Sequence, residues 1–217
     1  MDIGVLGTGI VGRSLATRLV ELGHVVTIGA RDAADPVAQD WLAGVGTARG
    51  ARAGTFAEAA AHGALVVNAT AGAASVAALR LAGERNLHGK VLIDVANPEE
   101  SEPGVEFSLL VVNDDSLGEQ IQRSFPDAKV VKTLNTVHVE VMTHPERLPE
   151  ETSVFVAGND AEAKATATDL LRSFGWRSIV DVGAISASRG LEMYLPLRRV
   201  LAATLGTNAL NLRIVRA

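Results

Sequence analysis

Three glycines near the N-terminus have the spacing of a phosphate-binding turn. Gly7, Gly9 and Gly12 form the pattern G-x-G-x-x-G. Glycines at these places allow a tight turn, a close approach of the backbone to a pyrophosphate, and close packing of the helix that follows. The N-terminus of that helix presents free N–H groups and a positive dipole end to the phosphate. The pattern predicts dinucleotide binding, and the alternative is a tight turn with nothing bound.

The residues on either side of this turn supply the context that a dinucleotide site needs. Ile3 to Leu6 is a short apolar run, and Val11 to Leu22 has apolar residues at helical spacing. Gly23 ends this predicted helix, and Val25 to Ile28 is a β-branched run typical of a buried strand. Together they form the strand–helix–strand unit of about 30 residues that accompanies the motif.

The end of the second predicted strand indicates which nucleotide binds. An NAD site usually has an acidic residue here for the ribose 2′-hydroxyl, but Ala30 occupies that place. Arg31 follows it, and a guanidinium suits a 2′-phosphate that an acidic residue would repel. This order favours NADP over NAD. In the alternative interpretation, Asp32 accepts a hydrogen bond from the ribose and Arg31 is only solvated.

Strand-like and helix-like segments alternate along the rest of the chain. The expected strands are Leu65–Asn68, Lys90–Pro98, Lys129–Asn135, Ser153–Asp160 and Arg177–Gly183. The expected helices are Phe56–His62 after an N-cap at Thr55, Gly72–Ala82, Ser116–Phe125, one starting within Thr136–Met142, and one between Asp160 and Gly175. Asp94–Ser116 is polar and is expected to be a long loop. The alternation predicts an α/β fold of the Rossmann type, with a doubly wound, mostly parallel sheet.

The pattern changes near the C-terminus. From Ser186 onward we expect one long helix with an apolar face, bent or offset at Pro196. We therefore expect an NADP-binding Rossmann domain over residues 1–150 and a small C-terminal α/β domain, with this helical annex, over residues 151–217. The apolar face either packs across the main domain or joins two copies of the chain, and we expect a homodimer.

Composition and charge limit the classes of partner. The chain has 20 basic and 25 acidic residues, and this net charge of −5 argues against nucleic acid. No segment approaches the ~20 apolar residues that span a bilayer, and Arg198 and Arg199 interrupt the late apolar segment. There is no cysteine and no metal-spaced cluster of histidine or acidic residues, so no metal is expected. We expect a cytoplasmic protein with a small-molecule substrate.

Short polar residues recur where three of the predicted strands end. These strand ends are Asn68–Gly72, Val95–Pro98 and Leu134–His138. Ligands of such sheets bind beyond the carboxyl ends of the strands, so these residues would face a nicotinamide. The alternative is that they only form turns. His138 is expected to make a structural hydrogen bond, and we assign no catalytic residue.

Three blocks of the chain resemble a known family of oxidoreductases. They are GVLGTGIVGRSLATRLVELGHVVTIGARD, VVKTLNTVHVEVM and VDVGAISASRGLEMYLPL, within a resemblance that runs from Met1 to about Leu205. They are similar to the NADP oxidoreductases that use the deazaflavin coenzyme F420 and to the nucleotide-binding domain of the STEAP metalloreductases. The resemblance implies a Rossmann-type NADP domain, a small C-terminal domain, and a deazaflavin or flavin in the cleft between them. Hydride would pass directly between the two rings, and the protein would mainly orient them.

The resemblance also implies roles for individual residues. Gly7, Thr8, Gly9, Ile10 and Val11 would hold the pyrophosphate, and Arg31 would hold the 2′-phosphate. Asn68, Ala69, Thr70, Ala96 and Asn97 would border the nicotinamide, and Asn135 and Thr136 would lie near the second ring. The chain departs from many NADP-selective members at Ala30, where they have Ser or Thr, and at Asp32, where they have a second basic residue.

Two other functions are compatible with these residues. One is NADPH-dependent reduction of a flavin or of a small carbonyl or imine compound. The other is a sensor that binds NADP without turnover and signals through its C-terminal helix. A hydride acceptor must stack on the nicotinamide, so a cleft with room for a tricyclic ring favours a reductase, whereas a closed cleft favours the sensor.

Overall fold

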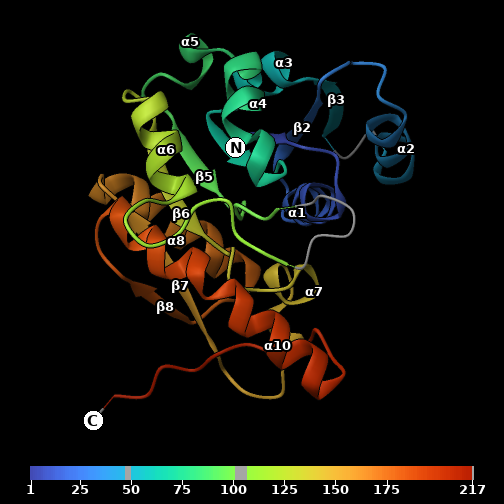
Figure 1. Ribbon diagram of the computed structural model, residues 1–217. Helices are drawn as coiled ribbons and strands as arrows, with labels where there is room; N and C mark the ends of the chain where they lie inside the picture. The colour runs from blue at the N-terminus through green and yellow to red at the C-terminus, as the bar shows by residue number, and fades with distance from the viewer. Residues whose placement is uncertain (47–49, 101–106, 217) are drawn as a thin grey trace.

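The structure is a computed structural model that describes residues 1–46, 50–100 and 107–216. In these parts eight strands form one sheet, in the order β3-β2-β1-β4-β5-β6-β7-β8, with helices on both faces (Figure 1). Neighbouring strands are parallel except β6 and β7, which are antiparallel. The predicted Rossmann-type α/β fold with a doubly wound, mostly parallel sheet is therefore confirmed.

The elements have the following bounds. The strands are β1 (Asp2–Leu6), β2 (Val25–Ala30), β3 (Ala51–Thr55), β4 (Leu65–Asn68), β5 (Val91–Asp94), β6 (Lys129–Thr133), β7 (Ser153–Gly158) and β8 (Ser178–Asp181). The α-helices are α1 (Ile10–Glu21), α2 (Pro36–Val45), α3 (Phe56–His62), α4 (Ser75–Ala82), α5 (Glu84–Leu87), α6 (Leu117–Ser124), α7 (Val139–Met142), α8 (Ala161–Phe174), α9 (Ser188–Met193) and α10 (Leu195–Leu205). Short 3₁₀ turns are η2 (Gly72–Ala74), η3 (Pro145–Arg147) and η4 (Ile185–Ala187).

Alternate side chains of the strands supply two apolar cores, one on each face of the sheet. Ile3 and Val5 of β1 join the core that contains residues of α1, α2, α7 and α8. Leu6 of the same strand joins the core that contains residues of α3, α4 and α6. Because successive side chains of a strand point to opposite faces, a helix layer must cover each face. The sheet is buried between these layers, and its carboxyl edge is left for ligands.

Several helices begin at the capping residues that the sequence predicts. Thr55 accepts a hydrogen bond from the backbone N–H of Glu58, whose side chain returns one to the Thr55 N–H. Ser116 caps α6, and Asp160 caps α8, which ends at Gly175. Each cap satisfies N–H groups that have no acceptor inside the helix.

Other elements differ from the expectations, and each difference has a local cause. The strand expected within Lys90–Pro98, which was to end in a Pro-containing loop, is β5 and ends at Asp94, whose carboxylate accepts the N–H of Ala96. The helix expected from Ser186 onward is divided into η4, α9 and α10, and Pro196 lies in the first turn of α10, where its missing N–H costs nothing. α2, β3 and α5 were not expected from the sequence.

The chain around residue 150 does not interrupt the sheet. β7 and β8 follow this point and extend the sheet that begins with β1. The division into domains at residues 1–150 and 151–217 stays a prediction. Part of the expected loop Asp94–Ser116, residues 101–106, lies outside the described residues, and the described part contains a bridge between Glu99 and Leu109.

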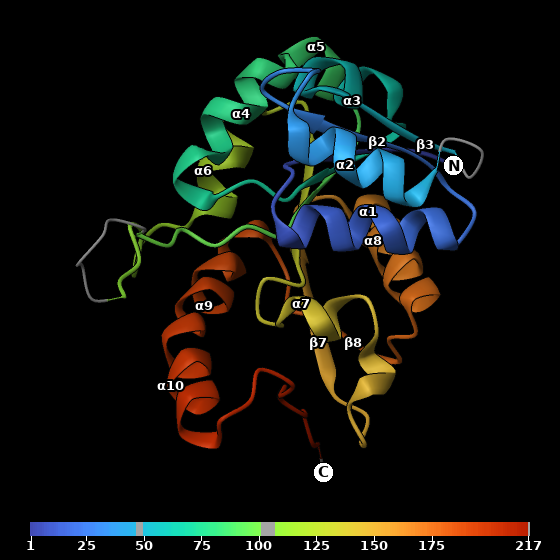
Figure 2. The same ribbon diagram turned by 90° about the vertical axis from the view of Figure 1, so that its right-hand side faces the viewer.

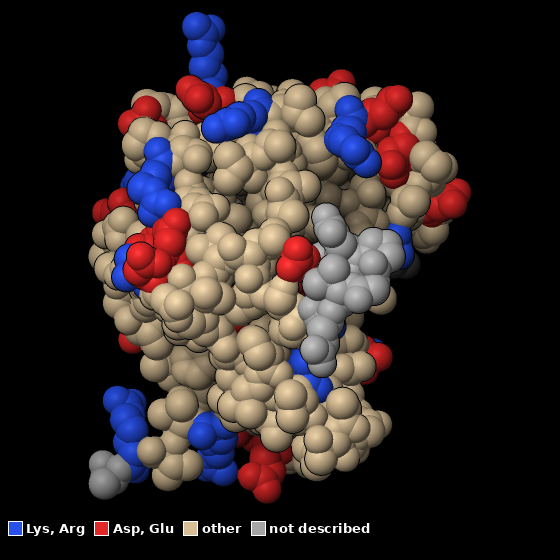
Figure 3. Space-filling view, in the orientation of Figure 1, with Lys and Arg blue, Asp and Glu red and all other residues tan. Residues whose placement is uncertain are grey.

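The C-terminal helices carry exposed apolar residues. Figure 2 shows α9 and α10 following one another along one side of the lower half of the molecule. Leu197, Val200 and Leu205 of α10 are 54%, 61% and 63% exposed. The homodimer through this helix stays a prediction. No helix in the described ranges has the length and apolar character needed to cross a membrane. On the face drawn in Figure 3, basic and acidic side chains are interspersed.

Candidate cofactor and substrate site

The glycine turn after β1 has the geometry of a phosphate cradle. Gly7 has φ +112°, and a Cβ there would lie 2.5 Å from the carbonyl oxygen of Ala69. A Cβ on Gly12 would lie 2.0 Å from the Gly7 carbonyl oxygen. These two glycines are required by the turn itself. Gly9 is different, because a Cβ there would meet no protein atom within 4 Å. Glycine at position 9 therefore suits a ligand that approaches the backbone from outside.

The N-terminus of α1 is open to an anion. Gly9 is its N-cap residue, no side chain caps it, and its first turn has no acidic residue. The Arg13 guanidinium donates a hydrogen bond of 2.8 Å to the Thr8 carbonyl oxygen and holds the preceding loop in place. Uncapped N–H groups and the helix dipole together favour a phosphate at this position.

Arg31 directly follows β2 at the same edge of the sheet. The backbone N–H of Gly7 donates to the Gly29 carbonyl oxygen at 2.9 Å, so the ends of β1 and β2 are adjacent. Ala30 is buried, whereas Arg31 is exposed. Asp32 is also exposed, but its carboxylate accepts the backbone N–H of Ala34 at 2.9 Å. Because Asp32 is already engaged in this turn, Arg31 is the better placed of the two to contact a nucleotide.

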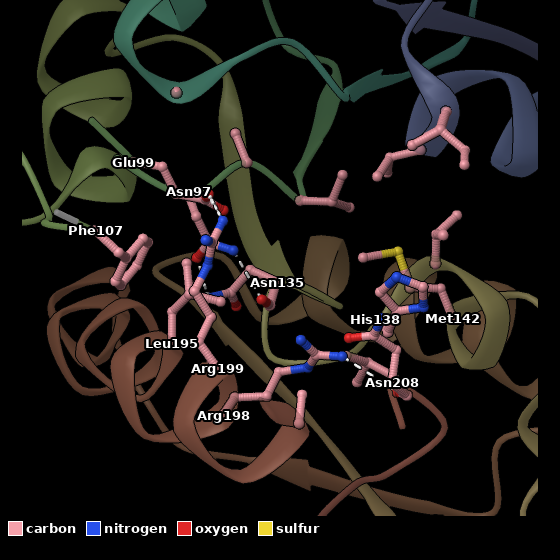
Figure 4. Close-up of a pocket in the computed structure, with 18 of the residues that line it drawn as sticks. Asn97, Glu99, Phe107, Asn135, His138, Met142, Leu195, Arg198, Arg199 and Asn208 are labelled. Carbon is pink, nitrogen blue, oxygen red and sulfur yellow. Dashed lines mark hydrogen bonds and ion pairs between the residues drawn. The ribbon is translucent and has the colours of Figure 1, made fainter. Parts of the chain in front are cut away.

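A cavity of about 1220 Å³ begins beside the glycine turn and extends to α10 (Figure 4). Its wall brings together the ends of β4, β5 and β6, the start of α1, the segment around α7, and one face of α10. Seven of the predicted cofactor-binding residues line it, namely Ile10, Val11, Ala69, Thr70, Ala96, Asn97 and Asn135. The three predicted strand ends also contribute Ala71, Gly72, Val95, Val137 and His138. Gly7, Thr8, Gly9, Gly12, Ala30, Arg31, Asn68, Pro98 and Thr136 are not part of its wall.

Asn97 and Asn135 form a reciprocal pair in the cavity wall. The Asn97 amide donates to the Asn135 carbonyl oxygen at 2.9 Å, and the Asn135 amide donates to the Asn97 side-chain oxygen at 2.9 Å. The Asn135 amide also donates to the Leu191 carbonyl oxygen of α9 at 3.0 Å. Leu134, just before this pair, has φ +60°, a conformation that L-residues rarely adopt. The pair therefore ties the ends of β5 and β6 to the C-terminal helices.

Asn68 supports the site from behind the wall. It is fully buried, and its amide donates to Asp94 at 2.8 Å and to Ser75 at 3.1 Å. Its side-chain oxygen accepts the Thr70 hydroxyl at 2.7 Å. All of its polar atoms are thus engaged by the protein, and the cavity is bordered by Thr70 instead.

Lys132 extends this network below the cavity. Its ammonium lies 2.8 Å from the Asp94 carboxylate, 2.7 Å from the Glu192 carboxylate and 2.5 Å from the Ala96 carbonyl oxygen. Burial alone would lower the pKa of Lys132, but the charges and hydrogen bonds of Asp94 and Glu192 raise it. Glu192 also accepts the N–H groups of Leu117 and Gly118 at the start of α6. This buried cluster locks α9 onto the sheet.

His138 lies on the wall near α10. It is the N-cap residue of α7, and its Nδ1 accepts the Glu140 N–H at 3.5 Å. Burial lowers the pKa of His138, the charge of Arg198 lowers it further, and Glu140 opposes these two effects. His138 is therefore neutral at pH 7. Across the described part of the chain, no group of three or more histidine and acidic side chains could hold a metal ion.

α10 contributes residues to this site that were not expected from the sequence. Arg198 and Arg199 both line the cavity, although in the sequence they served only as evidence against a membrane span. Arg199 pairs with Glu99 at 2.5 Å and lies 4.1 Å from the centre of the Phe107 ring. Two adjacent arginines within an apolar helix are the signal in the sequence, because such residues are rarely buried without a role.

Comparison with known proteins connects this geometry to a family. Residues 2–98 match the family model described as NADP oxidoreductase, coenzyme F420-dependent. The chain is 30% identical to metalloreductase STEAP3 of Rattus norvegicus over 197 residues, which are 90% of this chain and 36% of that protein. It is 29% identical to the F420-dependent NADP reductase of Methanocaldococcus jannaschii over 115 residues, which are 52% of this chain and 51% of that protein. The matches thus span about a third and about half of these two curated relatives.

A solved structure covers the whole chain. The crystal structure of a candidate F420-dependent NADP reductase from Arthrobacter sp. FB24 is 49% identical, with a TM-score of 0.95, over 100% of both chains. The likeness includes the glycine turn, the three strand ends and α10, because it spans every element described above. With the matching family model, this full-length relative shows that the chain belongs to the family of coenzyme F420-dependent NADP oxidoreductases.

Proposed function

We propose that this chain transfers hydride between NADP(H) and a deazaflavin of the F420 type that binds in the same cavity. The cavity itself is the observation that carries the proposal. Pockets for one small molecule commonly measure about 300–1,000 Å³. The cavity of about 1220 Å³ opens beside an uncapped helix N-terminus and therefore has room for a nicotinamide and a second ring. A closed cleft, which would favour a sensor without turnover, is not what these residues form.

The residues at the sheet edge fit NADP. The open N-terminus of α1 would hold the pyrophosphate, and the bare backbone at Gly9 would let it approach. Arg31 would hold the 2′-phosphate through charge-assisted hydrogen bonds. Family membership supports the same nucleotide, since both the family description and the Arthrobacter relative specify NADP.

The residues of the cavity wall suit hydride transfer because they would orient the two ligands and exclude water without reacting themselves. The nucleotide and the acceptor supply the redox chemistry when bound. Apolar side chains of Ile10, Val95 and Met142 line the wall and would exclude water. The interlocked amides of Asn97 and Asn135 give a rigid edge against which the rings would be placed. Holding two reactants in register accounts for a large part of the rate of such a reaction.

Absorbance measurements test the proposal directly. Purified protein is mixed with NADPH and oxidised coenzyme F420, and loss of the visible absorbance of the deazaflavin is followed, with NADH and FMN as parallel arms. We expect bleaching with NADPH and much less with NADH. Tight NADPH binding without bleaching of F420 would refute the deazaflavin as acceptor, and bleaching of FMN alone would replace it with a flavin.

A variant at Gly9 tests the position of the nucleotide. Gly9→Val should fold normally, because its Cβ meets no protein atom within 4 Å and its backbone has φ −64° and ψ 177°. It should nevertheless weaken NADPH binding, because the side chain blocks the approach of the pyrophosphate. Gly44→Val is the matched control, since Gly44 is also free of contacts within 4 Å but lies in α2. Equal NADPH affinity of the two variants would contradict the assignment.

A further inference from the structure

Arg198 is a buried cation in the wall of the cavity. Its side chain reaches from α10 toward His138 and Asn208 (Figure 4), and the residue is only 6% exposed. One terminal nitrogen donates to the Asn208 carbonyl oxygen at 3.3 Å, and its Nε has no hydrogen-bond partner. No carboxylate in the described ranges forms an ion pair with Arg198.

The neighbouring arginine shows that this condition is specific to one position. Arg199 also lines the cavity, but its charge is compensated by Glu99 and its guanidinium covers the Phe107 ring. Arg198 is the more buried of the two, yet it lacks such a partner. An unpaired charge shielded from water is unfavourable, so a buried guanidinium that borders open space calls for an anion.

The groups around Arg198 provide fewer hydrogen-bond acceptors than its guanidinium has donors. His138 is neutral, Asn208 contributes one carbonyl oxygen, and the interactions with Tyr194 and Glu99 only partly offset the burial that lowers the pKa of Arg198. In the proposed function the anionic groups of NADP are held at the N-terminus of α1, which borders the cavity at Ile10 and Val11, and at Arg31, which lies outside the cavity wall. The missing anion therefore belongs to a different molecule.

We propose that Arg198 binds a carboxylate or phosphate group of the second substrate at the α10 end of the cavity. The guanidinium would donate from its terminal nitrogens, as in the bidentate pairs that arginine forms with both anions. The acceptor would thereby be held at its charged end while its ring lies toward the glycine turn. This inference rests on the proposed function, because it assigns the charge of the substrate that the cavity accepts.

Ligand pairs that share a ring but differ in charge test the proposal by binding alone. FMN is compared with riboflavin, and coenzyme F420 with its deazaflavin chromophore that lacks the anionic side chain, in the NADP⁺-saturated protein. Dissociation constants are measured from the change in ligand fluorescence. In at least one pair we expect the anionic member to bind at least about tenfold more tightly, because a hydrogen-bonded charge contributes that much. Equal binding within both pairs, or no binding of any member, would overturn the proposal.

Variants assign the preference to one residue. Arg198→Gln should remove the preference for the anionic member, and Arg198→Lys should retain part of it. Arg172→Gln is the control, since it removes a paired, exposed guanidinium of α8 that does not line the cavity, and it should keep the preference. A preference that survives in Arg198→Gln refutes the assignment. If Arg198→Gln does not fold, the comparison of Arg198→Lys with Arg172→Gln decides, together with competition by inorganic phosphate against FMN in the unaltered chain.

Two further readouts separate this inference from its premises. The dissociation constant of NADP⁺ should be the same in Arg198→Gln and in the unaltered chain, and a tenfold weakening would instead place a nucleotide phosphate at Arg198. Turnover is scored separately. A charge preference that depends on Arg198 without bleaching of any ring sustains the anion site and rejects the hydride transfer. Bleaching without a charge preference supports the hydride transfer and rejects the anion site.

Discussion

Lys132 and Arg198 are both buried cations, but the structure surrounds them differently. Lys132, under the strand ends, contacts two carboxylates and a carbonyl oxygen within 2.8 Å. Arg198, on the cavity wall, has one carbonyl oxygen at 3.3 Å and a free Nε. The protein neutralises the charge of Lys132 with its own carboxylates. It supplies no carboxylate to Arg198, whose charge we propose is paired by a ligand. Burial of a cation therefore does not indicate its role until its partners are counted.

The largest expected effect comes from removing the paired cation. Lys132→Met should lower the free energy of unfolding by about 3–5 kcal/mol, because it leaves Asp94 and Glu192 buried, close together and without a counter-charge. Denaturation in urea measures this. Lys164→Met is the control, since its partner Asp181 is largely exposed, and it should cost no more than about 1 kcal/mol. Similar losses in both variants would show that the buried cluster stabilises the fold no more than an exposed ion pair does.

An exposed cation extends the comparison to the other end of the site. Arg31→Ser should raise the dissociation constant of NADPH by about 10- to 100-fold, because a charge-assisted hydrogen bond contributes about 1.5–3 kcal/mol. The dissociation constant of NADH should stay the same. Titration calorimetry measures both, and Arg177→Ser provides a control at another exposed arginine. Equal weakening of both nucleotides would favour a role for this strand end in the ribose rather than in the 2′-phosphate.

The unpaired cation should matter little for stability. Arg198→Met keeps the apolar stem of the side chain and removes a charge with no carboxylate partner. The free energy of unfolding should therefore stay within about 1 kcal/mol or rise. The same urea experiment measures it. A loss as large as that of Lys132→Met would mean that Arg198 has a structural partner, and it would weaken the case for a ligand.

The smallest effect should appear at His138. Burial and the charge of Arg198 hold the pKa of His138 below its ordinary value of 6.5, so Arg198→Met should raise it toward that value. It should stay below 6.5, because burial is the larger cause. Because the unfolded chain binds this proton more readily than the folded one, stability falls as the pH drops from 6.5 toward the lowered pKa of His138, and the variant should lose less stability over that range. Titration of the imidazole signals by NMR measures the shift, and an unchanged pKa would place the two groups further apart.

The features of this protein that were predictable from its sequence are local ones. The glycine turn, the capping residues Thr55, Ser116 and Asp160, and the apolar runs of the strands each depend on a few neighbouring residues. Their periodicity was enough for the Rossmann-type sheet. α2 was missed although Asp35 caps it and Pro36 stands in its first turn, which are local signals. β3 was missed because its residues, ARAGT, contain no apolar run and become a strand by pairing with β2.

The candidate site also contains some residues whose position was predictable from the sequence and others whose position was not. The residues that the cavity shares with the predicted set come from strand ends, and the rule that ligands bind beyond such ends located them. Asn68 was assigned to the nicotinamide on the same rule, but the structure engages its amide with Asp94 and Ser75. Whether a polar side chain at a strand end faces a ligand or the protein depends on which partners lie beside it, and sequence spacing does not report them.

The order of residues was sufficient to predict a phosphate-binding turn, an alternating α/β chain and a bias toward NADP, because each prediction depends on a few neighbouring residues. The partners of the buried charges depend on the tertiary structure alone. Asp94, Lys132 and Glu192 come from β5, β6 and α9, and they meet because the sheet and the C-terminal helices pack together. Arg198 lines the cavity for the same reason, since α10 and the strand ends, which are distant in the sequence, form walls of one cavity. Interactions between distant segments depend on packing, and packing is a property of the whole chain.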